Sequence, residues 1–135
     1  MSKKILLVDD DQDFRDLIQT QLECLGMTAL PAASAAEAQL MLETTQPDAA
    51  IVDLMMEEVD SGFVLCYWIK KRYPSTPVIM VSGVHSETRH RFDATTEEER
   101  AWLKADVMLD KPIRFETLRK ELERLLMRNH ATSKP

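Results

Sequence analysis

Residues 5–11 read ILLVDDD, an apolar run that ends in three consecutive aspartates. Ile5 to Val8 carries only large aliphatic side chains, which is the pattern of a central strand covered on both faces of a parallel sheet. The chain turns acidic at the point where this strand should end. The stretch therefore predicts a buried strand whose carboxyl end presents carboxylates.

Short apolar runs of this kind alternate along the chain with segments of helical periodicity. Apolar residues recur at helical spacing from Gln12 to Leu25, and Gly26 stands where a left-handed residue would end that helix. Ser34 and Glu37 have the spacing of a capping box, which predicts a second helix that closes before Pro47. Strands are predicted at residues 5–8, 27–30, 49–52, 78–81 and 107–109, and further helices at residues 63–73, from about 97, and at 115–127.

The alternation of strands with helices predicts an α/β fold. It is typical of an open, doubly wound, five-stranded parallel sheet with helices on both faces, and we expect the flavodoxin-like strand order 2-1-3-4-5. A chain of 135 residues is about the size of one domain. We therefore expect a single domain over residues 1–128 and a flexible C-terminal tail over residues 129–135.

Charge and composition argue against several classes of protein. A net charge of −6 disfavours a nonspecific grip on nucleic acid or on an anionic membrane. No apolar run approaches the ~20 residues that span a bilayer, and the first residues do not resemble a signal peptide. The two cysteines, Cys24 and Cys66, lack the spacing of metal ligands and are expected to be free thiols that fill core or half-buried positions. We expect a cytoplasmic protein that neither enters membranes nor binds nucleic acid directly.

Four of the five predicted strands end in residues suited to phosphoryl chemistry. These residues are Asp9 and Asp10, Asp53, Ser82 and Lys111. Ligands of doubly wound sheets bind beyond the carboxyl ends of the strands, where the strand order reverses, so the acids that end the first and third strands should converge. Carboxylates so close repel one another, and a hard divalent cation such as Mg²⁺ would offset that repulsion. The serine hydroxyl and the lysine ammonium could then meet further phosphoryl oxygens.

Four motifs at these strand ends resemble the receiver domain family of two-component response regulators, over the span from Lys4 to about Leu126. They read LLVDDD at residues 6–11, AAIVDLMM at 49–56, PVIMVSG at 77–83 and ADVMLDKPI at 105–113. The resemblance implies that Asp53 accepts a phosphoryl group from the phosphohistidine of a sensor histidine kinase or a histidine phosphotransfer protein.

The resemblance also implies roles for the neighbouring residues. Mg²⁺ is expected to bind Asp10 directly, Asp9 through water, Asp53, and the backbone carbonyl of Met55. Lys111 and Ser82 are expected to contact the phosphoryl group, and the peptide bond between Lys111 and Pro112 is expected to be cis.

The implied product is an altered protein surface. Movement of Ser82 toward the phosphoryl group should shift the face formed by the fourth strand, the fourth helix and the fifth strand, which would meet a downstream partner or a second copy of the chain. The chain is therefore expected not to be a turnover enzyme. Met55 and Val84, which the resemblance places beside the phosphoryl group, cannot orient water, so slow self-dephosphorylation is expected.

Two other functions stay open on the sequence. Glu57, Ser61 and Met108 depart from the family's usual residues, as does the long segment before the fifth strand, and these departures favour an interaction module that works without phosphorylation. A hydrolase of the aspartyl-phosphate type would carry a second acid two residues after Asp53, where this chain has Met55.

The first helix follows the acidic residues directly. Asp11 is expected to be its N-cap and not a metal ligand. One hypothesis is that a kinase partner contacts Phe14, Leu17, Ile18 and Gln21 on this helix, in which case charge reversal near them should slow phosphoryl transfer from the kinase.

Overall fold

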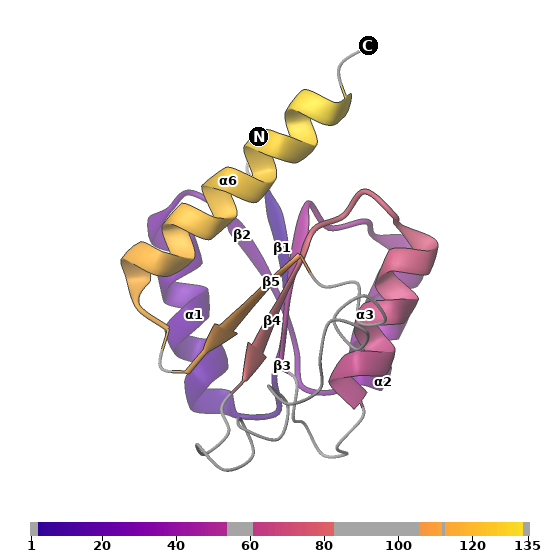
Figure 1. The fold of residues 1–135 in the computed structure, drawn as a ribbon. Coiled ribbons are helices and arrows are strands. Elements are labelled where there is room, and N and C mark those ends of the chain that lie inside the picture. The colour runs from indigo at the N-terminus through magenta and orange to yellow at the C-terminus, as the bar shows by residue number, and fades with distance from the viewer. Residues whose placement is uncertain (1–2, 54–60, 83–105, 112, 134–135) are drawn as a thin grey trace, which may run out of the picture.

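A computed structural model describes residues 3–53, 61–82, 106–111 and 113–133 of the chain. Its elements are β1 (Lys4–Val8), α1 (Gln12–Cys24), β2 (Thr28–Ala32), α2 (Ala35–Thr44), β3 (Ala49–Asp53), α3 (Ser61–Arg72), β4 (Val78–Ser82), β5 (Val107–Asp110) and α6 (Phe115–Ser133). Figure 1 shows the strands lying between the helices. Several predictions lie outside the described residues: the helix expected from about 97, Met55, Glu57, Val84 and the peptide bond to Pro112.

The five strands form one parallel sheet in the order β2-β1-β3-β4-β5, so the predicted fold class and strand order are confirmed. β1 and β3 are neighbours, with Val8 opposite Val52. β3 continues to Asp53, which lies opposite Val81 of β4. Because the strand order reverses at β1 and β3, the carboxyl ends of these two strands flank the switch point of the sheet.

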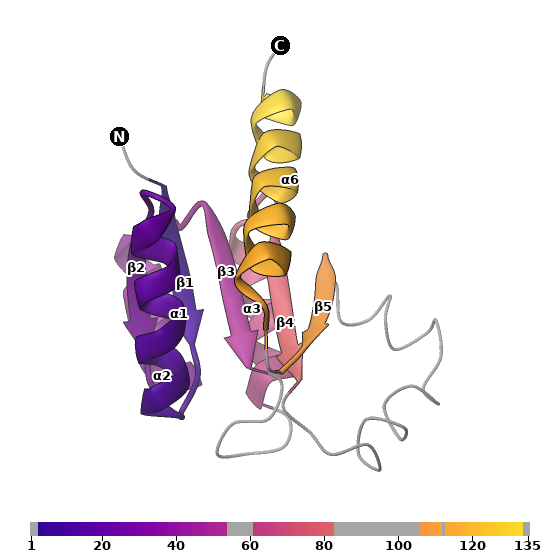
Figure 2. The ribbon, with the colours of Figure 1, turned by 90° about the vertical axis from the view of Figure 1, so that its left-hand side faces the viewer.

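The sheet is buried on both faces because helices cover both sides, toward which the side chains of successive strand residues alternately point. One core cluster joins the sheet to α2 and α3 through Leu6, Val8, Ala50, Val52, Val78, Met80, Ala38, Leu42, Leu65, Cys66 and Ile69. The other joins it to α1 and α6 through Ile5, Leu7, Ala49, Ile51, Ile79, Val81, Ile18, Leu22, Leu118, Leu122 and Leu125. Figure 2 shows the face of the sheet that α1 and α6 cover. None of the described helices is long and apolar enough to cross a membrane.

The helix ends follow the signals in the sequence. Asp11 is the N-cap of α1, and its side chain accepts hydrogen bonds from backbone amides of the first turn. The hydroxyl of Ser34 accepts from the amide of Glu37, whose carboxylate accepts from the amide of Ala33. Gly26 has a φ of 78° just after α1, a left-handed conformation that a residue with a side chain adopts at a cost.

The predicted ends of three elements were wrong. α3 begins at Ser61, two residues before the predicted start. β2 runs past Leu30 through Pro31, because an edge strand tolerates a residue that has no amide hydrogen to donate. α6 runs past Met127 to Ser133, so most of the predicted flexible tail is helical. Residues 128–133 contain neither glycine nor proline, and nothing in that stretch interrupts the backbone hydrogen bonds of a helix.

Two predictions for side chains of α1 were also wrong. Ile18 is fully buried, so it cannot face a kinase, whereas Leu17 is 52% exposed. Cys24 is exposed and does not fill the core, while Cys66 on α3 is buried, and neither cysteine forms a disulfide. Ile18 and Leu22 lie four residues apart on the face that meets the sheet, and Cys24 points elsewhere.

Candidate functional site

Three carboxylates meet at the carboxyl end of the sheet. Asp9 directly follows β1 and Asp53 ends β3, and these strands are paired neighbours. Oxygens of Asp9, Asp10 and Asp53 all lie within 4.8 Å of one another. Asp9 is fully buried, Asp53 is 4% exposed, and Asp10 is exposed. The cluster therefore combines two desolvated acids with one that faces solvent.

The loop that carries Asp9 is held by backbone contacts. The amide of Asp9 donates to the carbonyl of Ala32 over 3.1 Å, and the amide of Asp11 donates to Oδ1 of Asp9 over 2.8 Å. The Arg15 guanidinium donates to the backbone carbonyl of Asp9 over 2.7 Å. These contacts engage Oδ1 and the backbone of Asp9, and its Oδ2 lies beside the Lys111 ammonium.

Lys111 brings a positive charge into the cluster from the end of β5. Its Nζ lies 2.9 Å from Oδ2 of Asp9 and 3.8 Å from Oδ2 of Asp53, and its side chain is 22% exposed. The ammonium also lies over the ring of Phe14, 4.1 Å from the ring centroid. The structure thus gathers Asp9, Asp10, Asp53 and Lys111, four of the residues that the sequence singled out.

The electrostatics of the cluster fit a hard divalent cation. Three carboxylates beside one ammonium leave an excess of negative charge, and two unit charges at about 4 Å repel by about 4 kcal/mol at an effective dielectric of 20. Oδ2 of buried Asp9 accepts no hydrogen bond from any described residue, and its near neighbour is the Lys111 ammonium, with which it forms an ion pair at 2.9 Å. A buried carboxylate oxygen without a hydrogen bond, in an all-oxygen donor set, suits Mg²⁺.

For the other predicted site residues, the structure describes the backbone position of Ser82 only. Ser82 ends β4 opposite Asp110 of β5, which puts its backbone at the same edge of the sheet. Met55 lies outside the described residues, and so does the peptide bond between Lys111 and Pro112.

Two residues beside the site were not singled out as part of it: Phe14, which touches the Lys111 ammonium, and Arg15, which holds the loop. Both lie in the first residues of α1. The side chains of a helix tilt toward its N-terminus, so a helix that begins at an acidic loop brings its first residues back over that loop. This rule, applied to the sequence, could have found them.

A doubly wound parallel sheet with acids and a lysine at its switch point defines a class of ligand-binding α/β proteins. The family model of the response regulator receiver domain matches residues 5–123 of this chain. The chain belongs to the response regulator receiver domain family.

Individual relatives agree with this assignment. The transcriptional regulatory protein GltR of Pseudomonas aeruginosa is 33% identical over 132 residues, which cover 96% of this chain and 51% of that protein. The alkaline phosphatase synthesis transcriptional regulatory protein PhoP of Bacillus subtilis is 30% identical over 129 residues, covering 96% of this chain and 50% of that protein. The chain thus spans about half the length of these two regulators.

A solved structure supports the same family. The crystal structure of a CheY-like response regulator receiver domain protein from Methanospirillum hungatei matches with a TM-score of 0.82 at 26% identity, covering 98% of this chain and all of that one.

Proposed function

We propose that this chain is a phosphoacceptor switch of a two-component phosphorelay. Asp53 takes a phosphoryl group from a sensor histidine kinase or a histidine phosphotransfer protein. The observation that carries the proposal is the meeting of Asp9, Asp10 and Asp53 within 4.8 Å, with the Lys111 ammonium beside two of them. Membership of the receiver domain family supports it.

The receiver domain family supports Asp53 as the nucleophile, because the AAIVDLMM stretch at residues 49–56 carries this acid at the end of β3. Asp9 is fully buried, and its Oδ1 accepts the amide of Asp11. An oxygen of Asp53 forms a bond to phosphorus while the bond from phosphorus to the donor nitrogen breaks, and that electron pair returns to the imidazole ring. The product is an acyl phosphate, and no oxidation or reduction takes place.

The other residues of the cluster position and neutralise charge. Asp9, Asp10 and Asp53 would hold Mg²⁺, which when bound neutralises the carboxylates and an incoming phosphoryl oxygen. Lys111 exchanges its contact with Asp9 for a phosphoryl oxygen, and the hydroxyl of Ser82 donates to another. The chain acts once per phosphorylation and is not a turnover enzyme, and its acyl phosphate is lost slowly.

The output of the switch is a changed surface near β4 and β5. Met108 of β5 is 43% exposed there and is available for contact with a downstream protein or a second copy of the chain. The names of GltR and PhoP describe transcriptional regulatory proteins. We also propose that this chain acts in the cytoplasm and that its changed surface binds a downstream partner.

Mass spectrometry tests the proposed function. Incubation of the chain with Mg²⁺ and acetyl phosphate should add the mass of one phosphoryl group, and the Asp53→Asn variant should gain none. Asp16→Asn is the matched control, because it makes the same chemical change at an exposed position of α1 and should be labelled like the wild type. A wild type that stays unmodified with acetyl phosphate and phosphoramidate would overturn the proposal.

A second candidate is an interaction module that works without phosphorylation. The observation that favours it is exposed Met108 at a position where the family usually carries an aromatic switch residue. This function predicts weak Mg²⁺ binding and the same affinity for a partner in Asp53→Asn as in the wild type, whereas the switch predicts strong Mg²⁺ dependence.

A further inference from the structure

Phe14 lies against the ammonium of Lys111. The distance from Nζ to the ring centroid is 4.1 Å, well within the ~6 Å at which a cation is attracted to an aromatic face. The same ammonium lies 2.9 Å from Asp9 and 3.8 Å from Asp53. Lys111 is therefore held from one side by two carboxylates and from another by a ring.

The ring itself is held by the core. Phe14 is half-buried and packs against the core cluster shared by α1, α6 and the sheet. It belongs to the first turn of α1, whose N-cap is Asp11 of the acidic loop. The position of the ring is thus set by the same helix start that sets the acidic loop.

A lysine needs such support at a phosphoryl site. Its side chain is a flexible four-carbon stem that ends in a compact charge, and fixing it costs conformational entropy. The carboxylates of Asp9 and Asp53 attract the Lys111 ammonium, but attraction to two groups does not by itself fix Nζ at a single position. The face of a ring adds attraction along a further direction, and the attraction is stronger for a charge that is mostly removed from water, as Lys111 is at 22% exposure.

We propose that Phe14 is a positioning residue that holds the Lys111 ammonium between Asp9 and Asp53, where an incoming phosphoryl oxygen will meet it. An aliphatic side chain at this position would fill the same space in the core without attracting the charge. The effect on phosphorylation rests on the proposed function, whereas the contact between ring and ammonium does not. The two are therefore tested by separate measurements.

The contact is tested by nuclear magnetic resonance of the full chain labelled in its lysines. The Hε protons of Lys111, assigned by loss of the signal in Lys111→Met, should be shifted upfield by the ring current. In Phe14→Leu they should return toward the shift of an exposed lysine. A wild-type Lys111 signal without an upfield shift overturns the proposal, whatever the outcome of phosphorylation.

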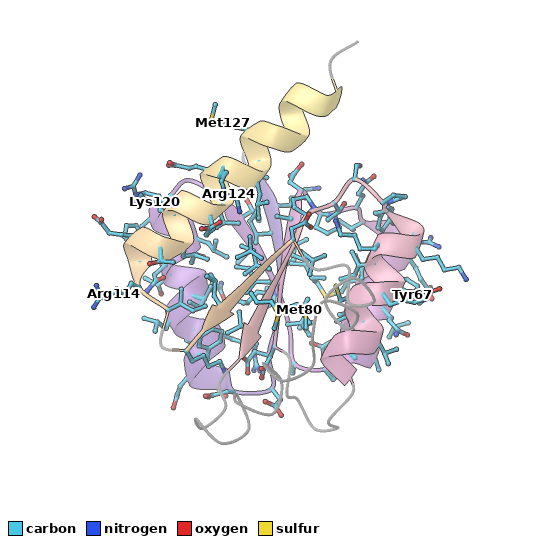
Figure 3. All side chains as sticks on the ribbon, viewed as in Figure 1. Tyr67, Met80, Arg114, Lys120, Arg124 and Met127 are labelled. Carbon is cyan, nitrogen blue, oxygen red and sulfur yellow. The ribbon has the colours of Figure 1, made fainter. Side chains whose placement is uncertain are left out.

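The consequence is tested by the rate of labelling with acetyl phosphate and Mg²⁺. Phe14→Leu should be labelled about two- to tenfold more slowly than the wild type, because the attraction of a cation to a ring is lost. Tyr67→Leu is the matched control, since this aromatic side chain is 43% exposed and points outward from α3 (Figure 3), and its labelling rate should be unchanged.

Fluorinated phenylalanines separate this effect from core packing. Each added fluorine at position 14 weakens the attraction of the ring for a cation while barely changing its shape, so the labelling rate should fall stepwise from phenylalanine to the trifluorinated ring. Thermal unfolding should stay unchanged across the series. Equal labelling rates along the series would show that Phe14 only fills space and would overturn the proposal. Absence of labelling in the wild type would instead overturn the proposed function. The resonance experiment would still show whether the Phe14 ring contacts the Lys111 ammonium.

Discussion

Replacement of Asp10 by asparagine should stabilise the protein when divalent cations are absent. Asp10 is exposed, and its carboxylate lies within 4.8 Å of those of Asp9 and Asp53. At that separation two unit charges repel by about 0.9 kcal/mol in water-like surroundings and by about 3.5 kcal/mol at an effective dielectric of 20. The smaller repulsion energy applies to Asp10 with Asp9 and to Asp10 with Asp53, because Asp10 faces solvent. Attraction between Asp10 and the Lys111 ammonium offsets part of the summed repulsion. We expect the free energy of unfolding to rise by about 1 kcal/mol, or about 3–5 °C in the unfolding midpoint.

Added Mg²⁺ should reverse this order of stability. A ligand at a hundred times its dissociation constant stabilises the folded state by about 2.7 kcal/mol, and Asp10→Asn should lose most of that gain because it lacks a metal ligand. The assay is thermal and urea unfolding of both proteins, first with a chelator and then with Mg²⁺. Asp16→Asn is the control, since it removes one charge from the exposed side of α1 and should respond to Mg²⁺ like the wild type.

Two results would refute the reasoning. One is an Asp10→Asn variant that is less stable than the wild type without cations, because the acids would then not repel one another. The other is equal stabilisation of both proteins by Mg²⁺, because the cation would then bind elsewhere.

Three further predictions follow from burial. Burial raises the pKa of the Cys66 thiol from 9.0 to about 12, so this thiol contributes stability that is present below about pH 9 and is lost as the pH rises toward 12. At about pH 8, iodoacetamide should modify exposed Cys24 in the folded protein and Cys66 only after unfolding, and rapid modification of both would contradict the structure. Leu122→Ala should lower the free energy of unfolding by about 2–5 kcal/mol in urea titrations, because Leu122 is fully buried between α6 and the sheet. Leu17→Glu should slow phosphoryl transfer from a kinase and leave labelling by acetyl phosphate intact, whereas Ile18→Glu should unfold the chain; a kinase indifferent to Leu17→Glu would remove α1 from the proposed contact.

The sequence was sufficient for the sheet and for most of the acidic cluster. The strand from Ile5 to Val8 is apolar throughout because both faces of a central parallel strand are covered, and this pattern is local and unambiguous. Once the strand order was expected, the meeting of Asp9 with Asp53 followed from topology alone, since the ends of paired parallel strands lie at the same edge.

Other features depend on contacts that no local pattern records. The extension of α6 to Ser133 could not be separated from a frayed polar tail, because polar residues without a breaker are compatible with both. The contact of Lys111 with Phe14 joins residues far apart in the chain, and its geometry depends on how α1 and the end of β5 pack. Leu17 and Ile18 both belong to the apolar pattern of α1, but periodicity gives the width of an apolar stripe and not which of its edges is covered.

We propose that Asp53 is the residue that becomes phosphorylated, in a site built from Asp9, Asp10 and Lys111. The most direct measurement is borohydride reduction of the chain after reaction with acetyl phosphate and Mg²⁺, followed by peptide sequencing, because borohydride converts an acyl phosphate of aspartate into homoserine. We predict homoserine at position 53 and at no other acid, and none when Mg²⁺ is removed. Homoserine at Asp9 or Asp10, or its absence under every donor, would contradict the account.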